Sequence, residues 1–121
     1  MKLASLPRGA IVLVAFPFTD LSATKVRPAL VLSGPDFHRR TQDAILAAIS
    51  SVVPPRPAPT SVVLPSGDAA FTISGLRVES VFHCGKLVTV QGKLIFKYLG
   101  RLGPSTLRRV DQALARAVGI T

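Results

Sequence analysis

The chain has 121 residues, 48% of them hydrophobic and 17% charged, which excludes a disordered polyelectrolyte and predicts one globular domain over residues 1–121. Its net charge of +9 favours nucleic acid or an acidic protein as a partner. A membrane surface is disfavoured, because the basic residues do not gather on one amphipathic helix and no apolar run has the length of a membrane span. The single cysteine, Cys84, excludes an internal disulfide and a cysteine-based zinc site, and it is typical of the reducing cytoplasm.

The first half of the chain contains apolar runs typical of buried strands at residues 11–16, 29–32 and 44–49. The connection at residues 17–25 is longer than a tight hairpin, and long connections in compact domains often carry function. Residues 36–40 are expected to form one helical turn. We expect Arg39 and Arg40 to be exposed there, with His38 in an exposed turn beside them.

The second half alternates short apolar runs with turn residues. Short strands are expected at residues 61–64, 69–73, 76–82 and 87–90. The proline-rich segment 52–59 cannot join a ladder and predicts a stiff loop, and residues 94–99 are either a strand or a short helix. Pro104 and Gly119 are typical of a helix start and stop, and between them runs one apolar stripe formed by Leu107, Val110, Leu114 and Val118. Short antiparallel strands closed by a helix predict a mainly β fold, a small and strongly curved β-barrel.

Two polar residues stand at the ends of predicted strands. Antiparallel pairing would bring Arg27, before the second strand, near Ser50, after the third. A guanidinium fixed beside a hydroxyl suits a site that binds a phosphate or cleaves a phosphodiester. Pro28 holds Arg27 in an extended conformation and predicts that it lies at the edge or start of a strand. The structural alternatives are a surface strand end for Arg27 and a strand-to-turn cap for Ser50 and Ser51.

Several segments form an ordered pattern along the chain. They are GAIVLVAFPFTDLSATKVRPALVL at residues 9–32, AAISS at 47–51, SGL at 74–76, SV at 80–81, KLVT at 86–89 and RLGPSTLRRVDQAL at 101–114. In this order they resemble the MazF/PemK family of toxin endoribonucleases. The resemblance implies an SH3-like β-barrel, a homodimer, cleavage of single-stranded RNA without metal or cofactor, and neutralisation by a cognate antitoxin. The net charge of +9 predicts that this antitoxin is acidic.

The resemblance also carries over catalytic positions. Arg27 falls on the family's catalytic arginine, and Ser50 falls on its catalytic threonine and keeps the hydroxyl. An arginine and an aspartate of the third block correspond here to His83 and Gly85, so the carboxylate is missing. We expect Arg27 to bind the scissile phosphate and Ser50 to bond the phosphate or place the nucleophile. His83, with an ordinary pKa of about 6.5, would carry the proton, and its alternative is a structural role.

RNA contacts are expected from further residues. Lys25 and Lys86 would follow the RNA backbone and Ser51 would add a polar contact. Phe16 and Phe18 would provide a stacking platform, although either could equally belong to the core. The two histidines lie far apart in the sequence, and no metal-ligand cluster is evident.

Two other functions remain open from the sequence. Gyrase-poisoning toxins use the same barrel and act through a tryptophan-containing tail, whereas residues 118–121 contain no tryptophan. A catalytically weak relative that binds only RNA or antitoxin is the other alternative, because His83 and Gly85 depart from the family pattern.

Overall fold

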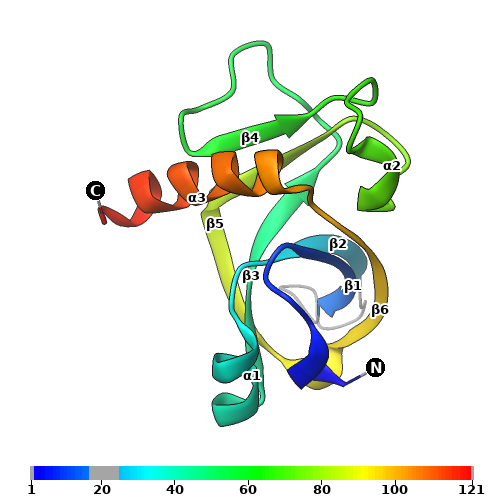
Figure 1. Ribbon diagram of the computed structural model, residues 1–121, viewed down its shortest axis with the longest axis vertical. Helices are drawn as coiled ribbons and strands as arrows, with labels where there is room; N and C mark the ends of the chain where they lie inside the picture. Colours follow the sequence, from blue (N-terminus) through cyan, green and yellow to red (C-terminus); the bar gives the residue numbers. More distant parts are fainter. Residues whose placement is uncertain (1, 17–24, 121) are drawn as a thin grey trace.

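The computed structural model describes residues 2–16 and 25–120. Its elements in chain order are η1 (Leu3–Ser5), β1 (Ala10–Phe16), β2 (Lys25–Val31), α1 (Pro35–Thr41), β3 (Asp43–Ser50), β4 (Ser61–Leu64), α2 (Phe71–Ser74), β5 (Ser80–Gln91), η2 (Gly92–Leu94), β6 (Ile95–Arg101) and α3 (Pro104–Val118) (Figure 1). The strands predicted at 11–16, 44–49 and 61–64 are confirmed within a residue at each end. Of the ambiguous residues 94–99, Leu94 ends the 3-10 helix η2 and residues 95–99 belong to strand β6.

The strands form one six-stranded sheet in the order β4-β5-β3-β2-β1-β6, and every neighbouring pair is antiparallel. The sheet curls around itself (Figure 1), but β4 and β6 stay at its two edges, so the barrel is open rather than closed. The predicted mainly β fold with a C-terminal helix is confirmed.

An irregularity in β5 bends this sheet. Ala47 of β3 pairs with Leu87, whereas the next residue, Ala48, pairs with His83. Residues 84–86 of β5 therefore lie between two partners that are consecutive on β3. Such a bulge bends the strand and changes the direction of its side chains. The sequence predicted a break at residues 83–86, and the structure shows a bulge inside one continuous strand there.

The uninterrupted apolar runs are explained by burial on both faces of the sheet. Ile11 belongs to one hydrophobic cluster and its neighbour Val12 to a second, and the same alternation holds for Leu30 and Val31. The first cluster lies under α3, while the second is covered by the N-terminal segment around Leu6. Strands buried on both faces lack the polar alternation of a half-exposed sheet.

Helix α3 closes one face of the sheet and packs against β4 and β5 (Figure 1). It begins with Pro104 in its first turn and ends at Gly119, whose φ of 79° is left-handed, as predicted. Val110 is buried at the centre of the predicted stripe, whereas Val118 is 48% exposed at its end. Within residues 2–16 and 25–120, no helix is long and apolar enough to cross a membrane.

Two strand predictions were wrong. Residues 69–73 were expected to be a strand but contribute to the short helix α2, and the strand expected at 76–82 begins only at Ser80. The short helix packs closely against β6. A Cβ at Gly100 would collide with the backbone of Ile73, so glycine lets α2 lie directly on β6.

The prediction that His38 lies in an exposed turn was also wrong. Residues 35–41 form helix α1, and His38 is on its inner side, only 1% exposed. Its Nε2 lies 2.7 Å from the hydroxyl oxygen of Ser33. The expectation that Arg39 and Arg40 are exposed is confirmed.

Candidate functional site

A cleft of about 690 Å³ gathers most of the residues singled out in the sequence. It lies where β2 begins and β3 ends, near the beginning of β5, and β6 and the segment after α2 form further walls. The lining residues from the sequence predictions are Arg27, Ser50, Ser51, His83 and Lys86. The remaining lining residues are Leu13, Pro28, Ala48, Ile49, Val52, Gly75, Leu76, Arg77, Val78, Ser80, Lys97 and Leu99.

Arg27 and Ser50 reach the cleft from neighbouring strands. Ala29 pairs with Ala48, and the same register continued two residues further places Arg27 opposite Ser50. Arg27 is exposed at this end. Strand β2 begins at Lys25 rather than at residue 29, so Arg27 lies near the start of the strand and not before it, and it pairs with β1. The ladder with β3 starts only at Ala29, so this part of β2 has one partner and tolerates Pro28.

The side chain of Ser50 makes one hydrogen bond to the described part of the chain. Its hydroxyl oxygen accepts the backbone N–H of Val52 at 3.0 Å, which is the strand-to-turn cap considered as the structural alternative. This bond uses a lone pair of the oxygen and leaves the O–H proton free for a second acceptor. The cap therefore fixes the hydroxyl without using its ability to donate to a bound anion.

His83 lies half-buried on β5, at the start of the bulge. Its Nδ1 is 3.1 Å from the hydroxyl oxygen of Ser61 on β4. Burial lowers the pKa of His83, and the nearby positive charge of Lys86 lowers it further. A neutral imidazole is thus favoured at neutral pH, and neutral imidazole can accept a proton.

The next two residues of β5, Cys84 and Gly85, are buried and exposed, respectively. Cys84 points into the core, where burial, together with the charge of Asp111, raises the pKa of its thiol to about 11, so the thiol is not a nucleophile at neutral pH. A Cβ at Gly85 would face Thr60, whose Oγ1 would be 3.5 Å away.

The cleft contains two cations that the sequence analysis missed, Arg77 and Lys97. Lys97 pairs with Leu13, which in turn pairs with Pro28, so the three form one row across β6, β1 and β2. No local pattern of β6 indicates which of its residues face this row; the pairing register decides it. With Arg27 and Lys86, the described lining of the cleft contains four cationic side chains and no carboxylate, which favours a polyanionic ligand.

Lys25, another predicted contact residue, is not part of the cleft lining. Lys25 is exposed and pairs with Phe16 at the far end of the β1–β2 ladder. Phe18 lies outside the described residues, so the stacking platform expected from Phe16 and Phe18 stays a prediction.

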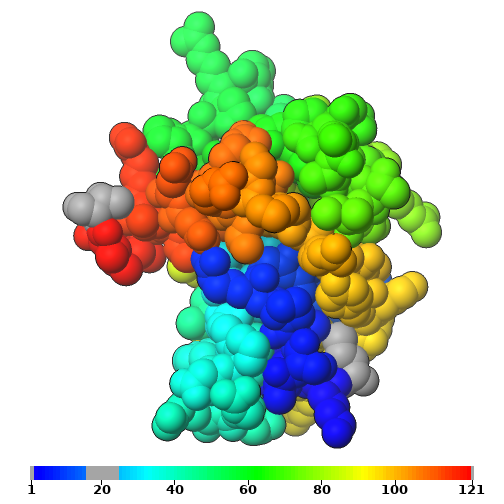
Figure 2. Space-filling model, in the orientation of Figure 1, coloured from blue at the N-terminus to red at the C-terminus, as the bar shows by residue number. Residues whose placement is uncertain are grey.

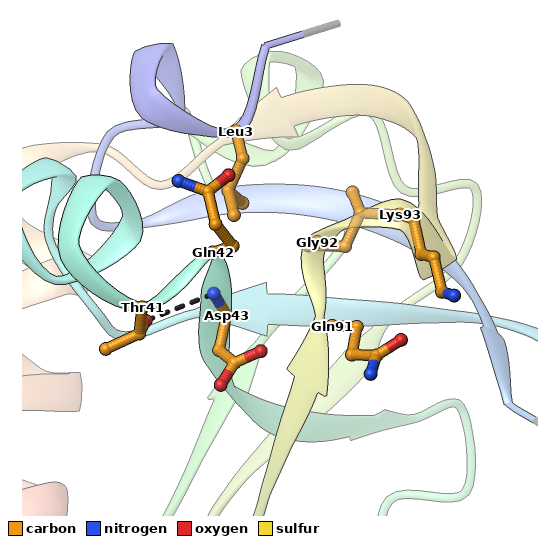
Figure 3. Close-up of a pocket in the computed structure, with 8 residues that line it drawn as sticks. Leu3, Thr41, Gln42, Asp43, Gln91, Gly92 and Lys93 are labelled. Carbon is orange, nitrogen blue, oxygen red and sulfur yellow. Dashed lines mark hydrogen bonds between the residues drawn. The ribbon is translucent and has the colours of Figure 1, made fainter.

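A second hollow, of about 590 Å³, lies at the other end of β3 (Figure 3). Asp43 and Gln91 pair across β3 and β5 there, and the backbone N–H of Asp43 donates to Thr41 Oγ1 at 3.1 Å. Its described lining contains none of the predicted site residues. In the part of the chain that the structure describes, no three His, Cys, Asp or Glu side chains are grouped as metal ligands.

Comparison with known proteins identifies relatives of the chain. The sequence profile of a family described as "PemK-like, MazF-like toxin of type II toxin-antitoxin system" matches residues 7–118. A search of curated protein sequences found no match. Among solved structures, an endoribonuclease in complex with its cognate antitoxin from a mycobacterial species has a TM-score of 0.77 and 21% identity, over 97% of this chain and 98% of that one.

Two further structures have similar folds. The MazE–MazF complex from Deinococcus radiodurans has a TM-score of 0.74 and 19% identity, over 96% of this chain and 98% of that one. The Mycobacterium tuberculosis toxin MazF-mt6 has a TM-score of 0.71 and 21% identity, over 91% of this chain and 96% of that one. At these identities the structural likeness establishes the fold.

Proposed function

Because the chain belongs to the PemK-like, MazF-like toxin family of type II toxin–antitoxin systems, we propose that it is an endoribonuclease that cleaves single-stranded RNA in the cytoplasm without a metal ion. The observation that carries the proposal is the grouping of Arg27, Ser50 and His83 around one cationic cleft. RNA brings its own nucleophile, the 2′-hydroxyl, so the protein has to position the phosphate, stabilise its charge and move protons.

Arg27 and Ser50 would bind the scissile phosphate. A guanidinium donates two parallel hydrogen bonds to phosphate oxygens and stabilises the negative charge that grows on them as the 2′-oxygen attacks. The O–H of Ser50, left free by its bond to Val52, would donate to the same phosphate or hold the nucleophile. The products would be a 2′,3′-cyclic phosphate and a 5′-hydroxyl.

The remaining cations would bind the flanking phosphates. Arg77, Lys86 and Lys97 line the cleft beside Arg27, and Ser51 is exposed at its rim. Such contacts position a nucleic acid without reading its sequence. They also predict binding that weakens as the salt concentration rises.

The proposal is tested by incubating a long single-stranded RNA with the purified protein in EDTA. Wild type should give discrete fragments with cyclic phosphate ends. Arg27→Ala should reduce the rate at least 100-fold, because it removes the main stabiliser of the transition-state charge. Arg108→Ala is the matched control, since Arg108 is an exposed arginine of α3 outside the cleft.

Each outcome of this assay has a defined meaning. Equal cleavage by wild type and Arg27→Ala would contradict the proposed site. Activity that appears only when EDTA is replaced by a divalent metal would contradict metal independence. Intact RNA with wild type under both conditions would contradict the enzyme proposal and favour the binding-only alternative that Gly85 suggested.

We propose an acidic antitoxin as the protein partner. Two of the similar structures are complexes with antitoxins, and the net charge of +9 favours an acidic segment. Such a segment would cover the cationic cleft and block cleavage. Binding that persists unchanged in high salt would contradict this electrostatic role.

The chain is also proposed to form a homodimer, as the family resemblance implied. Support comes from exposed apolar side chains around a shallow hollow beside α3, including Leu87, Val118 and Ile120, which are 41%, 48% and 76% exposed. A second copy covering them would bury this surface. Light scattering should give twice the mass of the chain, and a monomer at micromolar concentration would contradict the dimer.

A further inference from the structure

Ser61 of β4 lies directly opposite His83 of β5, and their side chains are in contact. The two are register partners in the β4–β5 ladder, so their side chains project from the same face of the sheet. The Ser61 hydroxyl oxygen lies 3.1 Å from Nδ1 of His83. His83 lines the cationic cleft, whereas Ser61 lines a different hollow, between β4 and α3. Ser61 thus contacts the imidazole from outside the cleft.

The contact with Ser61 determines which ring nitrogen of His83 can interact with a molecule in the cleft. Nδ1 is engaged by Ser61, and among the described residues no hydrogen bond is made by Nε2. Nε2 is therefore the nitrogen left for a molecule in the cleft. Because the two ring nitrogens of a neutral imidazole have opposite roles, a proton held on Nδ1 leaves a lone pair on Nε2.

The charges around His83 favour the neutral ring. The cleft places Arg27, Arg77, Lys86 and Lys97 on one side of it, and the hollow that Ser61 lines contains Arg109 and Arg116. Among the described residues, neither lining contains a carboxylate that would stabilise an imidazolium. Burial and the charge of Lys86 lower the pKa of His83. An uncharged hydroxyl suits this setting better than a carboxylate, which would favour the protonated ring.

We propose that Ser61 is a positioning residue that accepts a hydrogen bond from Nδ1–H of His83 and thereby presents Nε2 to the cleft as the general base of RNA cleavage. This inference rests on the proposed endoribonuclease function. In the reaction, the 2′-oxygen bonds to phosphorus, the bond from phosphorus to the 5′-oxygen breaks, and Nε2 takes the 2′-hydroxyl proton. The 5′-oxygen takes a proton from water, and the imidazolium returns its proton to the solvent.

Kinetics of Ser61→Ala, Ser61→Thr and the control Ser105→Ala provide the first test. Ser61→Ala should reduce kcat about tenfold, the value of one hydrogen bond, and leave KM unchanged. Its pH–rate profile should also shift, because the base is no longer held in one tautomer. Ser61→Thr keeps the hydroxyl and should restore both values. Ser105 is an exposed serine at the start of α3, so Ser105→Ala should behave as wild type.

A double-mutant cycle separates positioning from general stability. In a His83→Ala background, Ser61→Ala should cause no further loss of kcat, because the group that it positions is gone. A further tenfold loss in that background would overturn the proposal. Unchanged kcat and an unchanged pH–rate profile for Ser61→Ala alone would overturn it as well.

Nitrogen-15 NMR of the imidazoles tests the same contact without RNA. Above its pKa, His83 of wild type should carry its proton on Nδ1, and Ser61→Ala should shift the population toward the Nε2–H form, which free histidine prefers. A wild-type ring that is mainly Nε2–H would overturn the proposal. If wild type cleaves no RNA, the endoribonuclease function fails while this spectrum still decides whether Ser61 sets the tautomer.

Discussion

The hydroxyl of Ser50 and the backbone N–H of Val52 are joined by a 3.0 Å hydrogen bond at the point where β3 leaves the sheet. The bond holds the hydroxyl at the wall of the cationic cleft. It also makes Ser50 both a structural cap and a candidate ligand of the substrate, and substitutions can separate these two roles.

Ser50→Ala is expected to slow RNA cleavage about 10- to 100-fold, because a hydrogen bond to a charged phosphate contributes about 1.5–3 kcal/mol. The lost cap should lower the free energy of unfolding by only about 1 kcal/mol. Ser50→Thr keeps the hydroxyl and should retain most of the activity. Single-turnover rates and urea denaturation measure the two effects, and a Thr variant as slow as the Ala variant would contradict the role of the hydroxyl.

Gly100→Ala is expected to lower the free energy of unfolding by about 1–3 kcal/mol, because a Cβ at this position collides with the backbone of Ile73 and Ser74. The shift of α2 would also displace residues 75–78, which form one wall of the cleft. Gly67→Ala is the matched control, since a Cβ there meets nothing within 4 Å. Thermal unfolding should show a large decrease in Tm for the first variant and almost none for the second.

His38 is expected to make the fold sensitive to acid. Burial lowers its pKa below the ordinary 6.5, although a backbone contact with Leu3 opposes the shift. As the pH falls below about 6.5, the unfolded chain therefore binds a proton that the folded chain does not, and the free energy of unfolding decreases. With respect to His38, the fold therefore has its full stability above about pH 6.5 and loses part of it toward lower pH.

Urea denaturation from neutral pH to about pH 5 measures this dependence. His38→Gln should flatten the curve. His83→Gln is a necessary comparison, because the pKa of His83 is lowered as well. If both variants keep the wild-type slope, the acid sensitivity has another source.

Gly85→Asp is expected to fold normally and to raise the pKa of His83. The nearest atom to a Cβ at Gly85 is Thr60 Oγ1 at 3.5 Å, an ordinary van der Waals contact. A carboxylate two residues along the strand would stabilise the imidazolium of His83. Proton NMR titration of His83 measures the shift, and Gly85→Asn, with the same shape and no charge, should leave the pKa unchanged.

Lys97→Ala is expected to weaken RNA binding and reduce its salt dependence. Each phosphate contact to a single strand contributes about −0.7 to the slope of log K against log salt, so the slope should decrease in magnitude by about that amount. A fully 2′-O-methylated RNA, which has no nucleophile, allows the measurement without cleavage. Arg108→Ala should keep the wild-type slope, and an identical slope for Lys97→Ala would place Lys97 outside the RNA path.

The sequence predicted the parts of this protein that local chemistry controls. Aliphatic runs without breakers form strands β1 and β3, and Pro104 and Gly119 bound α3, because backbone restrictions of proline and glycine act wherever the fold places them. The antiparallel approach of Arg27 and Ser50 was also predictable, since it follows from two adjacent strands. The family resemblance supplied the proposed roles of these side chains.

Tertiary structure decided what depends on register and packing. Residues 69–73 look like a strand, yet residues 71–73 belong to helix α2, which lies directly on β6 where Gly100 leaves room for it. His38 looked exposed and is buried. Lys97 faces the cleft and Ser61 contacts His83 only because distant strands pair in one register. Side-chain period in a strand is two residues, so a shift of one residue would reverse each of these faces, and no local sequence pattern fixes that choice.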